Sequence, residues 1–303
     1  MSPTKEGSFH LFRAAGIDVY LHWSWLFVAI YQIQERAHRY TSLTWNVLEY
    51  LTLFLIILLH EFGHSLACRQ TGGTADQIVL WPLGGVAYVS PPQRPGAVLW
   101  SIAAGPLVNV VLFVILTALA SLNALPGPES VPTNAGTFLQ AVWLMNTGIL
   151  IFNLLPVYPL DGGQILRALL WFPLGRARSL SVAAGIGFVG VAGLAAVAVW
   201  LHSIWMGVLA AFVFMNCRRG WLQARALSTA AAIPRRAAFS CPSCGASPPV
   251  GDIWKCGRCG TAFDTFATNA ECPNCHETFP STRCLDCGAS HPMSAWAFRP
   301  PQR

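Results

Sequence analysis

LTLFLIILLHEFGHSL, residues 51–66, is an apolar run that ends in a His-Glu-x-x-His pattern. If the run is a helix, His60 and His64 lie one turn apart on one face, where two imidazoles can bind one metal ion. Glu61 then lies beside the metal, placed to accept a proton from water. The alternative is a set of polar side chains that are simply hydrogen-bonded inside a helix. A charged side chain at bilayer depth costs about 2.5–3.5 kcal/mol, so the apolar setting favours the metal site.

The composition indicates an integral, multi-pass membrane protein. Of 303 residues, 54% are hydrophobic and only 11% are charged, whereas a soluble domain carries about 25% charged residues. We expect an all-α polytopic membrane protein with about six transmembrane helices, a small membrane-associated β-hairpin or sheet, and a small C-terminal zinc-ribbon domain with four cysteine ligands per site. The expected spans are the second half of residues 16–30, then about 45–69, 97–122, 138–152, 180–201 and 204–217.

Two features between the second and fourth spans have open interpretations. Residues 76–90 contain two short apolar runs around Pro82 and Gly84-Gly85, which predict a hairpin or re-entrant strand pair. This pair either binds an extended substrate along its edge or closes the site as a structural loop. Asn109 is a polar residue inside the third span. It either bonds to a neighbouring helix or lines the active cavity.

A helix break follows the fourth span. Residues 153–163 read NLLPVYPLDGG, and two prolines with two glycines predict an unwound segment. Asp161 lies at the break, where membrane proteins commonly build ion sites. We therefore interpret Asp161 as the third metal ligand. It could also cap the helix that we expect over residues 162–170.

The basic residues predict an orientation. If six spans alternate, nearly all of the flanking Lys and Arg residues fall on one side, which the positive-inside rule makes cytoplasmic. Both termini are then cytoplasmic, and His60, His64 and Asp161 lie near the cytoplasmic ends of their spans. The residues on this side are Lys5, Arg13, Arg69, Arg94, Arg167, Arg176, Arg178, Arg218 and Arg219.

Four Cys-x-x-Cys motifs occupy the last quarter of the chain and predict two structural zinc sites in a reducing compartment. We expect the first two motifs to form one site and the last two the other, with a first-with-third arrangement as the alternative. The expected boundaries are a membrane domain over 1–220, a basic juxtamembrane helix and linker over 221–240, a tandem zinc ribbon over 241–290 and a flexible tail over 291–303. The eight ligands are Cys241, Cys244, Cys256, Cys259, Cys272, Cys275, Cys284 and Cys287.

Four motifs in order make residues 16–219 resemble the site-2 proteases, which are intramembrane zinc metalloproteases. They are HEFGH (60–64), PLGGV (82–86), GPLVN (105–109), and NLLP leading to PLDGG (153–163). The resemblance implies that His60, His64 and Asp161 bind catalytic Zn²⁺ and that Glu61 is the general base. It also implies that Asn109 and the Gly84-Gly85 strand help to hold substrate. The layout looks like the branch that includes the sporulation-factor-processing proteases.

The resulting expectation is peptide hydrolysis in membrane-embedded, single-span substrates near the cytoplasmic face, with one catalytic and two structural zinc ions. One rival is an inactive membrane scaffold that binds partners through its zinc ribbons, and the intact Glu61 argues against it. Another is a metal transporter or sensor, which would need polar residues in more of the spans. The tail has few basic residues, which favours a protein partner of the ribbons over nucleic acid.

Overall fold

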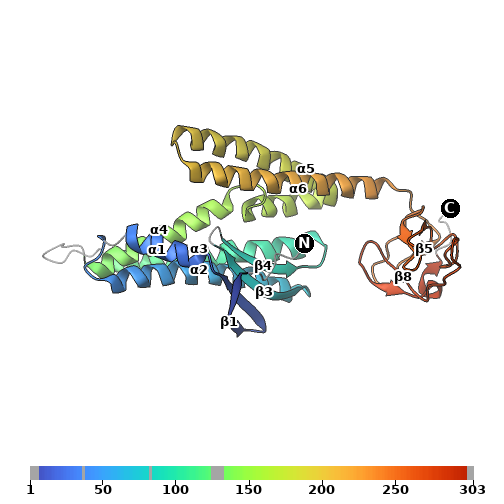
Figure 1. Ribbon diagram of the computed structural model, residues 1–303, viewed down its shortest axis with the longest axis horizontal. Helices are drawn as coiled ribbons and strands as arrows, with labels where there is room; N and C mark the ends of the chain where they lie inside the picture. Colours follow the sequence, from blue (N-terminus) through green and yellow to red (C-terminus); the bar gives the residue numbers. More distant parts are fainter. Residues whose placement is uncertain (1–6, 36–37, 82–83, 124–132, 299–303) are drawn as a thin grey trace. The chain divides into compact units, whose positions relative to one another are not determined.

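The computed structural model describes residues 7–35, 38–81, 84–123 and 133–298. The chain divides into two compact units, Met1–Ala224 and Arg225–Arg303, which we describe separately. Figure 1 shows the elements of the first unit. They are β1 (Ser8–Ala14), β2 (Ile17–His22), α1 (Trp25–Glu35), α2 (Leu43–Gln70), β3 (Thr74–Trp81), β4 (Gly84–Ser90), α3 (Pro95–Asn123), α4 (Asn134–Leu154), α5 (Asp161–Trp200) and α6 (Ile204–Ala232), whose last residues enter the second unit.

Four helices are long and apolar enough to cross a membrane: α2, α3, α4 and α5. The chain is therefore mostly helical, as expected, but the described residues give four candidate spans instead of six. The expected first span, the second half of residues 16–30, lies mostly in helix α1, whose 11 residues reach only about 16 Å at 1.5 Å per residue. Helix α6 follows the expected sixth span but continues without a break to Ala232, so span and juxtamembrane helix are one element.

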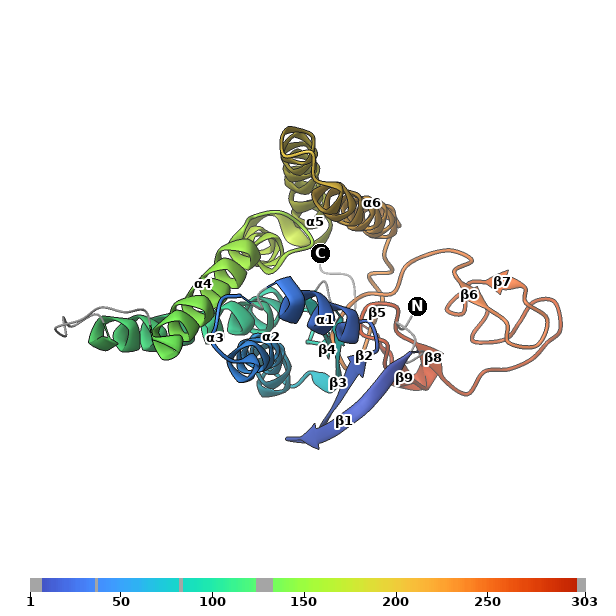
Figure 2. The ribbon, with the colours of Figure 1, turned by 60° about the vertical axis from the view of Figure 1, so that its left-hand side comes forward.

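Helices α2, α3 and α4 pack side by side and form the bundle around the site (Figures 1 and 2). Small residues make the close approach of α2 and α3 possible. A Cβ atom on Gly63 would lie 2.7 Å from the carbonyl oxygen of Ala104. Such contacts between small residues are the usual way in which membrane helices approach each other closely.

A four-stranded sheet in the order β1-β2-β3-β4 packs against α2. The predicted hairpin is confirmed by the antiparallel pairing of β3 with β4, although its turn, Pro82 and Leu83, lies outside the described residues. The sequence did not predict β1 and β2, of which β2 pairs parallel to β3. Strand β4 is at the edge of the sheet, and the core beneath it contains the fully buried Ile17, Ile78 and Leu80.

The predicted helix break is present between α4 and α5, at residues 155–160. Its two glycines allow the unwound segment to fold back on the first turn of α5, because a Cβ atom on Gly162 or Gly163 would overlap the backbone of this segment. The expected helix over 162–170 and the fifth span form one 40-residue element. It is kinked at Gly175, whose φ of 77° and ψ of 172° are non-helical.

The broken segment is also clamped by the helices that follow it. The Cys217 thiol of α6 donates to the carbonyl oxygen of Tyr158 over 2.9 Å. Glycines give the segment its space: a Cβ atom would lie 2.8 Å from the Tyr158 ring at Gly220, and 2.5 Å from a methyl group of Val157 at Gly190. The segment that leads into Asp161 is therefore packed on α5 and α6.

The second unit contains three two-stranded pairs. Strand β5 (Phe239–Ser240) pairs with β10 (Ala297–Phe298), β6 (Trp254–Lys255) with β7 (Ala262–Phe263), and β8 (Thr282–Arg283) with β9 (Ser290–His291). A short 3-10 helix covers Met293–Ala295. We expected a flexible tail over 291–303, but His291 pairs with Thr282 and Ala297–Phe298 pair with the start of the unit, while 299–303 lie outside the described residues.

Asp264 connects distant parts of this second unit. Its carboxylate accepts hydrogen bonds from the backbone N–H groups of Gly251 and Phe266. It also forms an ion pair with Arg236. Burial alone would raise the pKa of Asp264, but these donors hold it below its ordinary value. The backbone N–H of Arg236 also donates to Pro248. The expected linker is therefore built into the ribbon unit from about Pro234 onwards.

Candidate metal centre and active site

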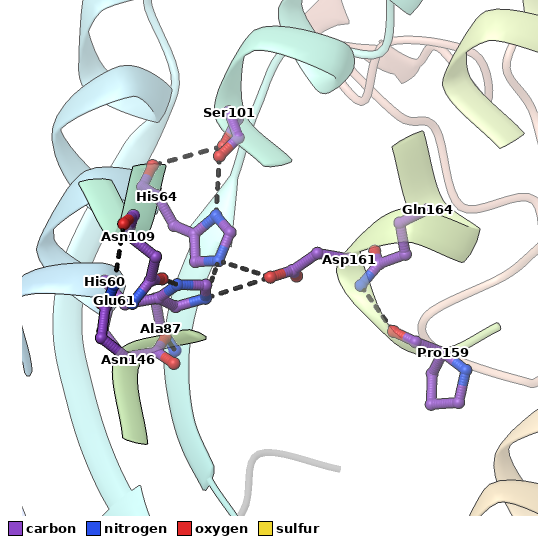
Figure 3. A network of polar contacts seen from close by, with 10 residues as sticks. All are labelled: His60, Glu61, His64, Ala87, Ser101, Asn109, Asn146, Pro159, Asp161 and Gln164. Atoms are coloured by element: carbon purple, nitrogen blue, oxygen red, sulfur yellow. Dashed lines mark hydrogen bonds and ion pairs between the residues drawn. The ribbon is translucent and has the colours of Figure 1, made fainter. Parts of the chain in front are cut away.

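His60, His64 and Asp161 converge on one point, as Figure 3 shows. The two Nε2 atoms are 3.0 Å apart. One carboxylate oxygen of Asp161, Oδ2, lies 3.0 Å from His60 Nε2 and 3.4 Å from His64 Nε2. Both histidines are buried in α2, and the aspartate begins α5. Two residues one helical turn apart and a third about a hundred positions later thus form one donor set.

Hydrogen bonds at the Nδ1 atoms fix the orientation of both imidazoles. The Nδ1–H of His60 donates to Asn109 Oδ1 over 2.6 Å, and the Nδ1–H of His64 donates to the carbonyl oxygen of Ser101 over 2.9 Å. A proton on Nδ1 leaves the Nε2 lone pair free. Both free lone pairs therefore face the Asp161 carboxylate, which is the usual arrangement of metal-binding histidines.

This donor set fits a zinc ion. Two donors bound to one tetrahedral zinc ion at about 2.0–2.1 Å lie about 3.3 Å apart, and the three observed separations are 3.0 to 3.4 Å. Two lone pairs and a carboxylate held this close repel one another unless a cation lies between them. Gly105 of α3 completes the fit, because a Cβ atom there would overlap His64 and approach His60 Nε2 to 2.9 Å.

Glu61 lies beside the donor set and is held by strand β4. Its Oε2 accepts the backbone N–H of Ala87 over 2.8 Å, while Oε1 has no hydrogen-bond partner among the described residues. Gly85 touches the same carboxylate so closely that a Cβ atom on it would overlap Glu61. The side chain is buried, so a carboxylate able to accept a proton is held next to three metal donors.

Asn109 and the Gly84-Gly85 pair, which we expected to hold substrate, occupy different places beside the metal donors. Asn109 is fully buried and bonds to His60 and to Asn146 of α4. It is therefore an interhelical hydrogen-bond partner, as one interpretation of the sequence had it, while its role in holding substrate stays a prediction. Gly84 and Gly85 begin the edge strand β4, with Gly84 opposite Trp81. Nothing in these contacts tests whether a substrate binds there.

Asn146 is a site residue that sequence reasoning missed. Its Nδ2 donates to the carbonyl oxygen of Asn109 and its Oδ1 accepts the Asn109 amide, at 3.0 and 2.9 Å. The two asparagines thus form a closed amide pair behind His60 (Figure 3). The signal was present in the sequence, because Asn146, like Asn109, is an amide side chain within a largely apolar helix.

The eight tail cysteines form two clusters, but neither expected pairing occurs. The first motif meets the fourth, and the second meets the third, so that one cluster is nested inside the other. The cross-motif Sγ–Sγ separations are 3.8 Å in the outer cluster (Cys241, Cys244, Cys284 and Cys287) and 3.6 Å in the inner one (Cys256, Cys259, Cys272 and Cys275). Four sulfurs at about 2.3 Å from a tetrahedral zinc ion lie about 3.8 Å apart, so both clusters fit zinc. The nesting follows from the strand pairs, because β5 and β10 bring the two ends of the unit together.

Comparison with known proteins identifies the membrane unit. Residues 49–125 and 121–197 match the model of peptidase family M50. The chain belongs to peptidase family M50. The matched ranges contain His60, Glu61, His64 and Asp161, and curated proteins similar to this chain are named zinc metalloproteases.

Relatives of this M50 member are found in archaea and in bacteria. It is 33% identical over 180 residues to a zinc metalloprotease of Methanocaldococcus jannaschii, covering 59% of this chain and 50% of that one. It is 33% identical over 188 residues to the putative zinc metalloprotease Rip3 of Mycobacterium tuberculosis, covering 58% and 46%. The solved site-2 protease of Methanocaldococcus jannaschii matches with a TM-score of 0.50 and 27% identity, over 71% of this chain and 95% of that one. The chain spans about half the length of the curated relatives.

Proposed function

We propose that this protein hydrolyses peptide bonds of membrane-embedded substrates, using one zinc ion held by His60, His64 and Asp161. The observation that carries the proposal is the convergence of these three donors, within 4.8 Å of one another, beside the Glu61 carboxylate. Three protein ligands leave the fourth position of a tetrahedral zinc ion open, as catalytic rather than structural sites do. When bound there, zinc supplies a Lewis acid that polarises a carbonyl group and makes water more acidic.

In this proposal the chain supplies the general base, Glu61, and a strand edge, that of β4, along which the substrate binds. Glu61 Oε1 accepts a proton from the attacking water, while the Ala87 N–H holds Oε2. Because alternate residues of a strand direct their backbone groups to the same side, Gly85, Ala87 and Val89 face the free edge of β4. An unwound substrate segment would pair with this edge, and Gly84-Gly85 would let it approach Glu61.

Three finer features belong to the same proposal. Cleavage occurs near the cytoplasmic face, with both termini in the cytoplasm, because the basic residues gather at the α2 and α5 ends that carry the site. The substrates are single-span proteins processed in regulated intramembrane proteolysis. The two cysteine clusters hold structural zinc and give the chain a protein-binding module, for a total of three zinc ions.

The decisive experiment compares the purified full chain with its Glu61→Gln variant. The amide can keep the Ala87 hydrogen bond but cannot accept the proton, so we expect zinc content to stay unchanged and cleavage to fall by at least a thousandfold. Substrates come from membrane proteins that accumulate uncut in cells carrying only Glu61→Gln. Asp76→Asn is the control, since that carboxylate is on exposed β3 surface.

Cleavage that survives in Glu61→Gln would contradict the role of this residue. A wild-type chain that binds zinc at His60, His64 and Asp161, yet cuts no protein that accumulates in the variant cells, would support the inactive scaffold instead.

A further inference from the structure

Two arginines of α5, Arg167 and Arg176, both contact the ring of Trp171. The guanidinium carbon of Arg167 lies 5.9 Å from the centroid of the Trp171 ring, and that of Arg176 lies 5.8 Å from the same ring. Both distances are in the range of cation–π contacts. Arg176 follows the non-helical Gly175, so the kink brings an arginine of the second helical segment to the tryptophan of the first.

Neither arginine has a counter-ion in the part of the chain that the structure describes. No carboxylate pairs with either guanidinium, although arginines elsewhere in the chain form ion pairs, such as Arg69 with Asp76 and Arg235 with Asp286. The Nε–H groups of Arg167 and Arg176 are buried without a hydrogen-bond partner. Two like charges around one ring, each with an unpaired buried donor, are costly unless an anion joins them.

The surroundings of this cluster indicate a lipid. Leu169, Phe172 and Leu174 lie on either side of Trp171 in the sequence and are 49%, 61% and 38% exposed. Trp171 packs against a cluster formed by Ala168 of α5 with Val98 and Ile102 of α3. An apolar exposed surface next to cationic side chains and a tryptophan is typical of a membrane–water interface.

We propose that Arg167 and Arg176, with Trp171 between them, bind the phosphate group of an anionic phospholipid whose acyl chains lie along Phe172 and its apolar neighbours. Arginine binds phosphate oxygens through two parallel N–H groups, which would satisfy the buried Nε–H donors. Basic sites at the ends of membrane helices bind acidic headgroups in the same way. Since Arg167 lies less than two turns after Asp161 on the same helix, the bound lipid would lie at the border of the catalytic unit.

The test uses the full chain reconstituted in nanodiscs of phosphatidylcholine alone or with one-third phosphatidylglycerol. Thermal unfolding and native mass spectrometry report stabilisation and retained lipid. The variant is Arg167→Gln with Arg176→Gln. The charge-matched control is Arg218→Gln with Arg219→Gln, two exposed arginines of α6. Unfolding in phosphatidylcholine alone checks that each protein is folded, and the single variants Arg167→Gln and Arg176→Gln replace the double one if it is not.

We expect phosphatidylglycerol to raise the unfolding temperature of wild type and control by several degrees, and one phosphatidylglycerol to stay bound in the mass spectrum. The Arg167/Arg176 variants should lose the bound lipid and most of the shift. Equal retention by the variants would overturn the proposal. So would inorganic phosphate in phosphatidylcholine discs if it reproduced the whole shift, because the site would then bind a free anion.

Discussion

At the scale of single residues, the metal site needs a position without a side chain as well as the side chains that bind the ion. Gly105 has no side chain where a methyl group would overlap His64 and crowd His60. The donor set exists because α3 presents bare backbone to both imidazoles, in a motif that also supplies Asn109 four residues later.

Replacement of Gly105 by Ala should therefore displace the imidazoles and weaken zinc binding by at least tenfold. Competition with a chelator, followed by counting of the retained zinc, measures the effect. Gly148→Ala is the matched control, because that glycine is also inside a membrane helix but has no atom within 4 Å of a Cβ position. Equal zinc retention in both variants would show that the crowding is harmless.

The amide pair behind His60 makes a second prediction at this scale. Asn146→Leu keeps the volume but removes both hydrogen bonds to Asn109, so His60 loses its fixed orientation. Loss of such an outer partner typically lowers metal affinity by about 10–100-fold. The same zinc competition measures it, with Asn216→Ala as control, since the Asn216 amide donates to Phe212 of its own helix. If only thermal stability falls and zinc affinity does not, Asn146 is a packing residue.

At the scale of elements, α6 acts on the metal centre through the broken segment. Gly220 and Cys217 contact Tyr158, three residues before Asp161. Gly220→Ala should push on the tyrosine ring and cost about 1–3 kcal/mol of stability, with weaker zinc binding at the catalytic site. Gly207→Ala in the same helix has open space and should be neutral or gain up to about 1 kcal/mol from helix propensity. Denaturant unfolding compares them, and equal stabilities would exclude the clamp.

The sequence predicted those elements whose signal is local. The apolar run before His60, the Pro- and Gly-rich break before Asp161 and the β3–β4 hairpin all correspond to elements of the structure. Strand β2 was not predicted, because a short apolar segment such as Ile17–His22 has the same composition in a strand and in a membrane helix. The pairing of Cys-x-x-Cys motifs could not be derived either, since it depends on the contact of β5 with β10, whose residues are almost sixty positions apart.

At the scale of the whole molecule, the nested clusters can be tested by zinc counting. Each cluster holds one ion in our proposal, so Cys241→Ser with Cys284→Ser should remove one zinc ion per chain. Cys241→Ser with Cys256→Ser should remove two. If neighbouring motifs formed the sites instead, the first double variant would lose two zinc ions and the second would lose one. Native mass spectrometry of the full chain measures the number of bound zinc ions. The difference between the two variants does not depend on whether the catalytic site also holds zinc.

The nested order also constrains how the chain is made. The ligands of the inner cluster lie between Cys256 and Cys275, so all four are synthesised before the last two ligands of the outer cluster. Cys241 and Cys244 are synthesised before the inner cluster but wait for Cys284 and Cys287, the last two of the eight. A chain whose synthesis stops in this interval carries Cys241 and Cys244 without their two partners, so the outer cluster is the one that every truncation before Cys284 leaves incomplete.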